Sequence, residues 1–153
     1  MIDLLLWLTG RRPVETVAMG TNIASQGTGF EFNDTVTALL RFDDGIIAKI
    51  SANFPCVYPH FHDVAVFGTE ATWRNAPDVA LFYQSRDPQT SPQLLNEPYP
   101  GSHKGDLIPS FVSAVLDGGR SEIERSDVLD SMAVSLAIER AANSGLPEQI
   151  NYH

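Results

Sequence analysis

The middle of the chain alternates hydrophobic and polar residues with the period of a β-strand. The alternation runs through 34–42 and returns through 46–54, with Asp43, Asp44 and Gly45 between the two runs. Asp and Gly favour tight hairpin turns. The pattern therefore predicts an antiparallel hairpin with one dry face. The residues of that face are Val36, Ala38, Leu40, Phe42, Ile46, Ala48, Ile50, Ala52 and Phe54.

The opposite face of this hairpin carries little charge for a surface in water. Its charged residues on the two strands are Arg41 and Lys49, and Leu39 and Ile47 lie among them. Weak charge with interspersed aliphatic side chains is typical of an interface core. We therefore expect this face to pair with another copy of the chain. Its residues are Thr35, Thr37, Leu39, Arg41, Ile47, Lys49, Ser51 and Asn53.

Further strands are expected on both sides of the hairpin. Alternation over 14–19 predicts a strand before it, and the runs 61–67, 71–74 and 79–84 predict that the meander continues after it. A long stretch with many prolines and glycines, 85–104, lacks periodicity and predicts a surface loop. The tail at 148–152 predicts a short edge strand.

Three segments have helical spacing. The first covers 2–8 and ends at Gly10, and the second covers 107–116 behind Asp106 as its N-cap. The third starts at a Ser126 cap and runs to Ser144, where Gly145 and Pro147 end it. Its apolar positions extend most of the way round the helix, as expected of a helix buried against a sheet.

Runs of strands followed by runs of helices predict the fold class. We expect an α+β fold in which an open-faced, mainly antiparallel sheet has helices packed on one face. The two carboxy-terminal helices are expected to cover the dry face. A length of 153 residues with 43% hydrophobic residues fits one domain spanning 1–153.

Charge and cysteine content limit the classes of partner and the cellular compartment that this protein would have. The net charge of -9 and the presence of two lysines disfavour nucleic acid and membrane surfaces. The apolar run 4–8 is too short to span a bilayer and lacks the features of an export signal. The single cysteine, Cys56, cannot form an internal disulfide and fits a reducing compartment. We expect a cytoplasmic protein.

Cofactor and catalytic motifs are incomplete in this sequence. A dinucleotide fingerprint needs three glycines between a strand and a helix. Gly27 and Gly29 are the nearest approach, but Phe32 stands where the third glycine belongs and a helix is not predicted after it. We therefore expect neither catalytic nor cofactor-binding residues in this chain.

Two histidines next to a tyrosine form the best local constellation. On a strand, His60 and His62 would point to the same face, which suits two ligands of one transition metal. A third ligand would have to come from Asp63, Cys56 or His103. The commoner role of such residues is to line a pocket or an interface, and a histidine beside Tyr58 also suits a polyol substrate.

Five segments, taken in their order along the chain, resemble the carboxy-terminal domain of the glucose-fructose oxidoreductase and inositol dehydrogenase family (Gfo/Idh/MocA). They are spread over nearly the whole chain, from residue 2 to residue 147. The segments are IDLLLWLTG at 2–10, DTVTALLRFDDG at 34–45, VFGTE at 66–70, IPSF at 108–111 and SGLP at 144–147.

This resemblance implies a two-domain NAD(P)-dependent oxidoreductase. In the family, an amino-terminal Rossmann domain joins an antiparallel sheet whose open face commonly packs against another subunit. The enzymes transfer hydride between the cofactor and a hydroxyl of a sugar, cyclitol or related polyol. Their Glu-Lys-Pro motif and Asp-x-x-x-His pair are absent here, and the histidine would stand immediately ahead of Met1. We therefore expect this fragment to be cut just after the catalytic groups and to be inactive alone.

The resemblance also implies where substrate is bound. In inositol dehydrogenase-like members a Tyr-x-Tyr-Asp segment between two strands reaches the substrate. Tyr58 matches the first tyrosine, His60 replaces the second and Phe61 replaces the aspartate. We expect Tyr58, His60 and His62 to bind substrate, while these departures leave its identity open. The choice between NAD and NADP is also open, because it depends on residues after the second Rossmann strand, which this sequence does not contain. Two alternatives are a stand-alone non-catalytic assembly module and a metal-dependent lyase using His60 and His62.

Overall fold

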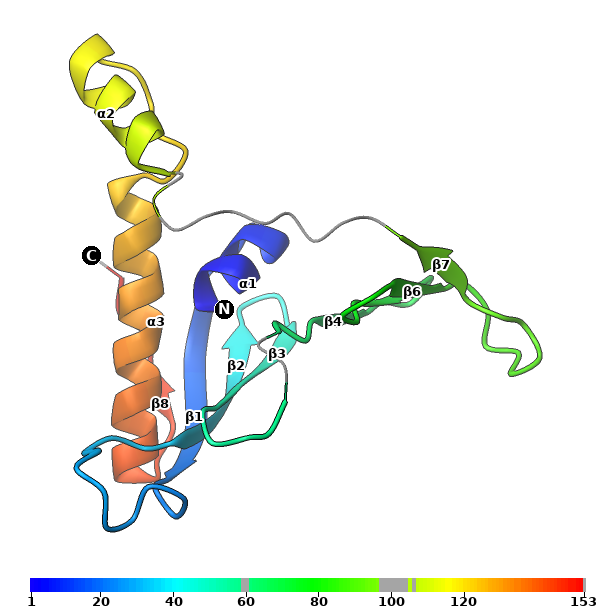
Figure 1. Ribbon diagram of the computed structural model, residues 1–153, viewed down its shortest axis with the longest axis horizontal. Helices are drawn as coiled ribbons and strands as arrows, with labels where there is room; N and C mark the ends of the chain where they lie inside the picture. Colours follow the sequence, from blue (N-terminus) through cyan, green and yellow to red (C-terminus); the bar gives the residue numbers. More distant parts are fainter. Residues whose placement is uncertain (59–60, 97–104, 106, 153) are drawn as a thin grey trace. The chain divides into compact units, whose positions relative to one another are not determined.

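The computed structural model describes residues 1–58, 61–96, 105 and 107–152 (Figure 1). The chain divides into two compact units, one made of Met1–Val57 with Gly105–His153 and the other of Tyr58–Lys104. The elements in chain order are α1 (Ile2–Thr9), β1 (Pro13–Thr21), β2 (Thr35–Phe42), β3 (Ile47–Asn53), β4 (Ala65–Phe67), β5 (Thr72–Arg74), β6 (Ala80–Tyr83), β7 (Gln93–Leu95), α2 (Leu107–Asp117), α3 (Arg125–Ser144) and β8 (Glu148–Gln149).

The first unit is built on a four-stranded antiparallel sheet with the order β3-β2-β1-β8. The long helix α3 packs on β1, and α1 packs on α3. The predicted hairpin, the strand before it and the short tail strand are all present. The predicted α+β class with an open-faced antiparallel sheet is confirmed.

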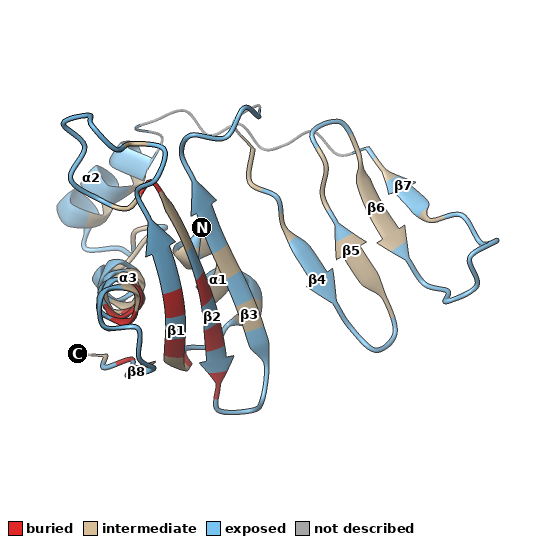
Figure 2. Cartoon of the chain, turned by 90° about the horizontal axis from the view of Figure 1, so that it is seen from below, coloured by how far each residue is buried: buried red, intermediate tan, exposed pale blue. Residues whose placement is uncertain are grey.

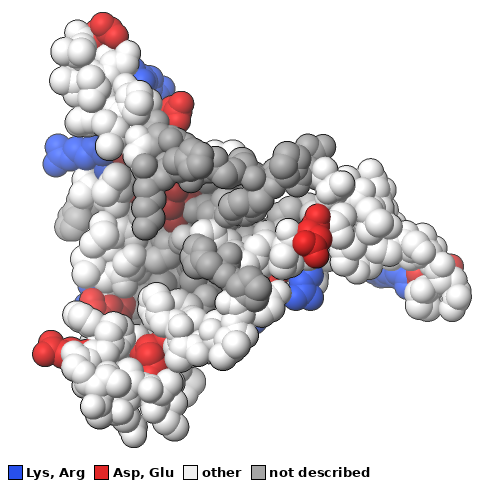
Figure 3. Space-filling model, viewed as in Figure 1, with Lys and Arg blue, Asp and Glu red and all other residues white. Residues whose placement is uncertain are grey.

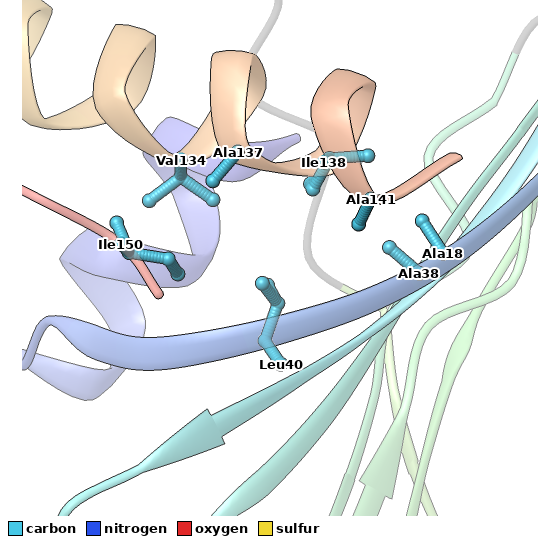
Figure 4. Packing of buried hydrophobic residues seen from close by; sticks show 8 residues of the cluster. All are labelled: Ala18, Ala38, Leu40, Val134, Ala137, Ile138, Ala141 and Ile150. Atoms are coloured by element: carbon cyan, nitrogen blue, oxygen red, sulfur yellow. The ribbon is translucent and has the colours of Figure 1, made fainter. Parts of the chain in front are cut away.

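The core of this unit lies between α3 and the sheet. Leu40 and Val134 are fully buried there, and Ile150 from the tail closes the same space (Figure 4). Burial alternates along β2 as the period-two pattern requires (Figure 2). The buried residues of the cluster are Ala18, Ala38, Leu40, Val134, Ala137, Ile138, Ala141 and Ile150.

The dry face is less complete than its sequence pattern indicates. Val36, Ala38, Leu40 and Phe42 of β2 are buried or half-buried. On the neighbouring run, however, Ile46 is 42% exposed and Ala52 and Phe54 are exposed. The reason is that α3 packs over β1, whereas β3 is the strand at the edge of the sheet.

The helices that cover the sheet are α1 and α3, so the expectation that α2 covers it is wrong. Ile2 and Leu5 of α1 pack against the core, whereas α2 has no buried residue. Figure 1 shows α2 beyond the amino-terminal end of α3, away from the sheet. A hydrogen bond from the backbone N–H of Glu122 to Oγ of Ser110, 3.0 Å long, ties the interhelical loop to α2.

The start of α3 differs from the predicted Ser126 cap. Glu124 is the N-cap, and its backbone N–H donates to Oδ2 of Asp127 at 2.8 Å within a reciprocal capping box. Two carboxylates at the first turn also complement the positive end of the helix dipole. The other predicted ends are confirmed, because Gly10 and Gly145 both take the left-handed conformation after α1 and α3. The predicted cap of α2, Asp106, lies outside the described residues.

The second unit is a separate antiparallel sheet with the order β4-β5-β6-β7. The expectation that one meander continues through these strands is therefore corrected to two sheets. Strand β7 lies inside the stretch predicted as loop, and it pairs with β6 through Ala80 and Leu95. None of the unit's described residues is buried, and Trp73 and Phe82 face each other across β5 and β6 half-buried.

A buried carboxylate organises the long loop between β1 and β2. Asp34 is 3% exposed, and its Oδ2 accepts the backbone N–H groups of Ala24 and Ser25 at 2.9 and 2.8 Å. Burial by itself would raise the pKa of Asp34. The hydrogen bonds from Ser25, Thr35 and Ala24 outweigh burial, so the pKa lies below its ordinary value.

We expect Asp34→Asn to lower stability at neutral pH and to remove part of the decline in acid. Ionised Asp34 stabilises the fold above the unfolded-state pKa of about 3.9, and this contribution is lost as the pH falls through the lower folded-state pKa. Urea denaturation at pH 7 and at steps below about pH 4 measures the effect. Asp78→Asn, at an exposed aspartate, is the control. An unchanged acid profile for Asp34→Asn would contradict the prediction.

Within the described residues, no helix combines the length and apolarity needed to cross a membrane.

Candidate functional site

The candidate substrate segment lies between β3 and β4. Tyr58 is 60% exposed and is the first residue of the second unit. His62 is half-buried in the same unit. His60 lies outside the described residues, so its position relative to Tyr58 and His62 stays a prediction.

Asn75 fixes the second half of this segment. Its Nδ2 donates to the backbone oxygen of His62 at 2.8 Å, and its Oδ1 accepts the backbone N–H of Val64 at 2.7 Å. The backbone N–H of Asn75 donates in turn to the oxygen of Val64 at 3.0 Å. An ion pair of 3.2 Å joins Asp63 to Arg74 alongside. The backbone that carries His62 is therefore held against the end of β5.

Sequence reasoning missed this role of Asn75. The available signal was an asparagine directly after a strand, where its amide can satisfy one backbone donor and one acceptor. Which backbone it would satisfy depends on the pairing of β4 with β5, and the sequence alone does not fix that pairing.

Metal binding gains no support from the described chain. Among the described residues, His, Cys, Asp and Glu do not come together in groups of three that could hold an ion. Cys56 is exposed, and its Sγ donates to the backbone oxygen of Asn53 at 3.2 Å. His60 and His103, two of the proposed ligands, lie outside the described residues.

The glycine-containing loop does not fit a dinucleotide. Gly27 and Gly29 lie between β1 and β2, so a strand follows them in place of the helix whose amino terminus would hold a pyrophosphate. The loop is closed on itself instead, with the hydroxyl of Thr28 donating to the oxygen of Ser25 at 2.7 Å. This loop therefore offers no structural basis for binding the cofactor's phosphates.

The arginines of the chain mostly pair with carboxylates. On the face seen in Figure 3, positive and negative side chains lie scattered and do not form a basic patch. The carboxylates of Glu124 and Asp127 lie at the positive end of the α3 dipole, and the pair with Arg120 lowers the pKa of Glu124. The ion pairs are Arg11–Asp44, Arg12–Asp130, Arg41–Glu15, Arg74–Asp63, Arg120–Glu124 and Arg140–Glu148.

One of these pairs helps to hold the carboxy-terminal tail in place within the first unit. Arg12 pairs with Asp130 and lies 5.2 Å from the ring centre of Tyr152. The hydroxyl of Tyr152 donates to the backbone oxygen of Pro13 at 2.7 Å. Burial, together with the Asp130 carboxylate, raises the pKa of Tyr152 to about 12, so its phenol remains protonated and donating at neutral pH.

Two hollows open on the first unit. One of about 330 Å³ lies between α1 and the start of α3, where Asp3, Trp7 and Asp127 are among its walls. The other, of about 480 Å³, lies between the loop before β2, the sheet and the carboxy-terminal half of α3. We call the second hollow the β2–α3 groove. Its residues are Ile2, Asn22, Glu31, Phe32, Asn33, Val36, Ala38, Ile50, Ala52, Ser135, Ile138, Glu139, Ala142 and Asn143.

Similarity to known proteins supports the resemblance seen in the sequence. Residues 1–74 match the family described as the GFO/IDH/MocA C-terminal domain. The matched stretch is 74 of the 153 residues. The Gfo/Idh/MocA match includes α1, the β1–β2–β3 sheet and the Tyr58 segment, and it ends with β5. No curated protein matches the chain by sequence.

Solved Gfo/Idh/MocA oxidoreductases share the fold of the chain. The aldose-aldose oxidoreductase from Caulobacter crescentus, complexed with glycerol, is 20% identical, with 97% of this chain and 44% of that chain covered and a TM-score of 0.74. The WlbA dehydrogenase from Bordetella pertussis, in complex with NADH and UDP-GlcNAcA, is 20% identical, with 99% and 44% covered and a TM-score of 0.67.

A third similar structure is the UDP-N-acetylglucosamine 3-dehydrogenase GnnA from Acidithiobacillus ferrooxidans. It is 18% identical, with 94% of this chain and 44% of that chain covered and a TM-score of 0.72. Identities this low show the shared fold alone. The chain spans 44% of the length of these three proteins.

Proposed function

We propose that this chain is the substrate-binding and oligomerisation domain of an NAD(P)-dependent oxidoreductase acting on a sugar, cyclitol or related polyol. The observation that carries the proposal is the Gfo/Idh/MocA match over 1–74. The shared fold with dehydrogenases supports it, since the WlbA structure holds NADH and UDP-GlcNAcA and that of levoglucosan dehydrogenase holds NADH and levoglucosan. Those ligands combine a nicotinamide cofactor with a sugar derivative.

The cofactor in this proposal binds outside the 153 residues. The loop with Gly27 and Gly29 does not fit a pyrophosphate, and the chain corresponds to less than half of each of the three oxidoreductases compared above. A dinucleotide-binding domain would supply the cofactor, NAD or NADP, and the proton-transfer groups. The isolated chain is accordingly inactive.

The substrate contacts in this proposal come from Tyr58, His60 and His62. A phenol and two imidazoles can both donate and accept hydrogen bonds, which matches the hydroxyls of a polyol. The Asn75 contacts support this role, because a backbone held on both sides of His62 reduces the ordering that substrate binding would otherwise require.

The remaining partners follow from charge and from the open face of the first sheet. We infer a homo-oligomer formed through that face. Pairing of the arginines and a net charge of -9 argue against nucleic acid and membrane surfaces as partners. A cytoplasmic location agrees with one exposed cysteine, Cys56.

The stand-alone assembly module is the second candidate, favoured by the apolar residues on the open face. The metal-dependent lyase has no support from the described residues. The reading frame upstream of Met1 separates the first two candidates, because an oxidoreductase requires G-x-G-x-x-G and Glu-Lys-Pro motifs in frame ahead of this chain.

We expect the longer polypeptide to oxidise sugars or polyols with NAD or NADP, and the 153-residue chain to do neither chemistry nor cofactor binding. Absorbance at 340 nm follows turnover, and calorimetry measures cofactor affinity. For the isolated chain we expect a dissociation constant above about 1 mM, which corresponds to a binding free energy weaker than roughly -4 kcal/mol. Tighter binding by the isolated chain, or an upstream frame without these motifs, would contradict the proposal.

In that longer enzyme, Tyr58→Phe and His60→Ala each test substrate contact. We expect each to lose about 1–3 kcal/mol in kcat/KM, because a substrate hydroxyl is left without its partner. The loss should fall mainly on substrate affinity, with cofactor affinity unchanged. Tyr83→Phe, at the exposed end of β6, is the matched control. Activities within about twofold of the parent for both variants would place these residues outside the pocket.

A further inference from the structure

The β2–α3 groove has an apolar floor. Val36, Ala38 and Ile50 line it from the sheet, and Ile138 and Ala142 line it from α3. Ala38 and Ile138 also belong to the buried core, so part of the floor is fixed by packing. A volume of about 480 Å³ lies within the range of roughly 300–1,000 Å³ typical of small-molecule sites. The groove can therefore take the apolar body of a small molecule.

Two carboxylates give this groove a negative charge. Glu31 comes from the loop before β2 and Glu139 from α3, while lysine and arginine are absent from the described residues that line the groove. Both side chains are exposed, and neither makes an ion pair within the described chain. A ligand cation would thus meet two carboxylates that lack a competing partner.

The loop wall of the groove is already ordered by internal contacts. Asp34 holds the backbone of Ala24 and Ser25, as described above. Gly20 leaves room for Asn33, because a Cβ at position 20 would lie 2.4 Å from Asn33 Nδ2. The Asn33 amide lines the groove in the space that this glycine permits. A wall ordered in advance lowers the entropic cost of binding.

We propose that the β2–α3 groove binds a small organic ammonium ion with an aromatic or aliphatic body. The apolar body covers the floor formed by the sheet and α3, and the ammonium group lies at Glu31 and Glu139. The choice of a cation follows from charge complementarity, because the lining offers two unpaired carboxylates and amide groups but no positive charge. This binding activity is separate from the proposed oxidoreductase function and does not depend on it.

The test compares two probes of similar shape on the 153-residue chain. Phenethylammonium carries the positive charge, and 2-phenylethanol replaces it with a hydroxyl. We expect amide shifts at the groove residues in an NMR titration, with a dissociation constant on the order of 1 mM for the amine. The alcohol should bind about fivefold more weakly, because it cannot form the solvent-exposed ion pairs with Glu31 and Glu139, and such pairs contribute modestly.

Variants separate the charged rim from the apolar floor. Glu31→Gln with Glu139→Gln should weaken amine binding about fivefold and leave the alcohol unchanged. Glu70→Gln, at an exposed glutamate of the second unit, should change neither. Ala52→Phe should fill the floor and weaken both probes, with thermal unfolding used to verify that each variant is folded.

Three results would overturn the proposal. The first is the absence of saturable shifts at the groove up to about 10 mM amine. The second is equal affinity for amine and alcohol, which would leave an apolar hollow without selectivity for a cation. The third is unchanged amine affinity in the folded double glutamine variant.

Discussion

Leu40→Ala is expected to lower the free energy of unfolding by about 2–5 kcal/mol. Leu40 is fully buried in the cluster where β2 meets α3, with Val134 and Ile150 in the same cluster. Truncation removes apolar contacts and leaves a cavity that the surrounding strands and helix can fill only in part. Urea denaturation followed by circular dichroism measures the loss.

Leu146→Ala is the matched control for that experiment. Leu146 is 64% exposed, beyond the end of α3, and surface truncations of this kind change stability by about 0.5 kcal/mol or less. A loss at Leu40 no greater than at Leu146 would mean that the sheet and α3 do not form the folding core.

The hairpin of β2 and β3 could be predicted from the sequence because its signal is local. Alternation along β2 is set by burial on one side, and Gly45, with φ of 90°, takes the backbone conformation that the turn requires. The caps at Gly10 and Gly145 are local in the same sense. Such features depend on residues that are neighbours in sequence, so they can be predicted from one sequence without knowledge of tertiary contacts.

Which helices pack on the sheet could not be predicted, because this packing depends on contacts between segments that are distant in sequence. The apolar spacing of α2 predicts a helix, and a helix is present, yet spacing alone does not say what surface it meets. Ile46 is an aliphatic residue at a dry-face position, but α3 lies over β1 and leaves it exposed. Strand β7 lacks a long alternating run and becomes a strand by pairing with β6.

The residues of the candidate sites also fall into those that the sequence could identify and those that only the structure reveals. Tyr58 was identified from its place in a family pattern, and the match over 1–74 includes it. Asn75 and Glu139 gave no such signal, because one acts through a backbone thirteen residues away and the other joins a groove built from separate segments. Residues brought together only by tertiary structure are invisible to local pattern analysis.

The open face of the first sheet has the character of an interface. Val17 and Met19 of β1 lie on this face beside β2, with Val17 opposite Leu39. Met19 is 82% exposed. One of its two cations is neutralised in place, since Arg41 pairs with Glu15 at 3.2 Å, and Gln149 donates to the same carboxylate at 2.7 Å. Exposed aliphatic side chains with few charges among them are more typical of a surface that another protein covers than of one in water.

Leu39→Asp with Ile47→Asp is therefore expected to split the oligomer and halve its mass. Light scattering after size-exclusion chromatography should give at least twice 16.8 kDa for the parent chain at micromolar concentration, and half the parent mass for the variant. In a two-fold interface each copy presents the same patch, so both copies would bring aspartates into it and oppose association strongly. Leu136→Asp with Leu146→Asp places the same charges at exposed residues on and just after α3, which packs on the other side of the sheet, and should leave the mass unchanged. A parent chain that is monomeric under these conditions would refute the interface and indicate a solvated face.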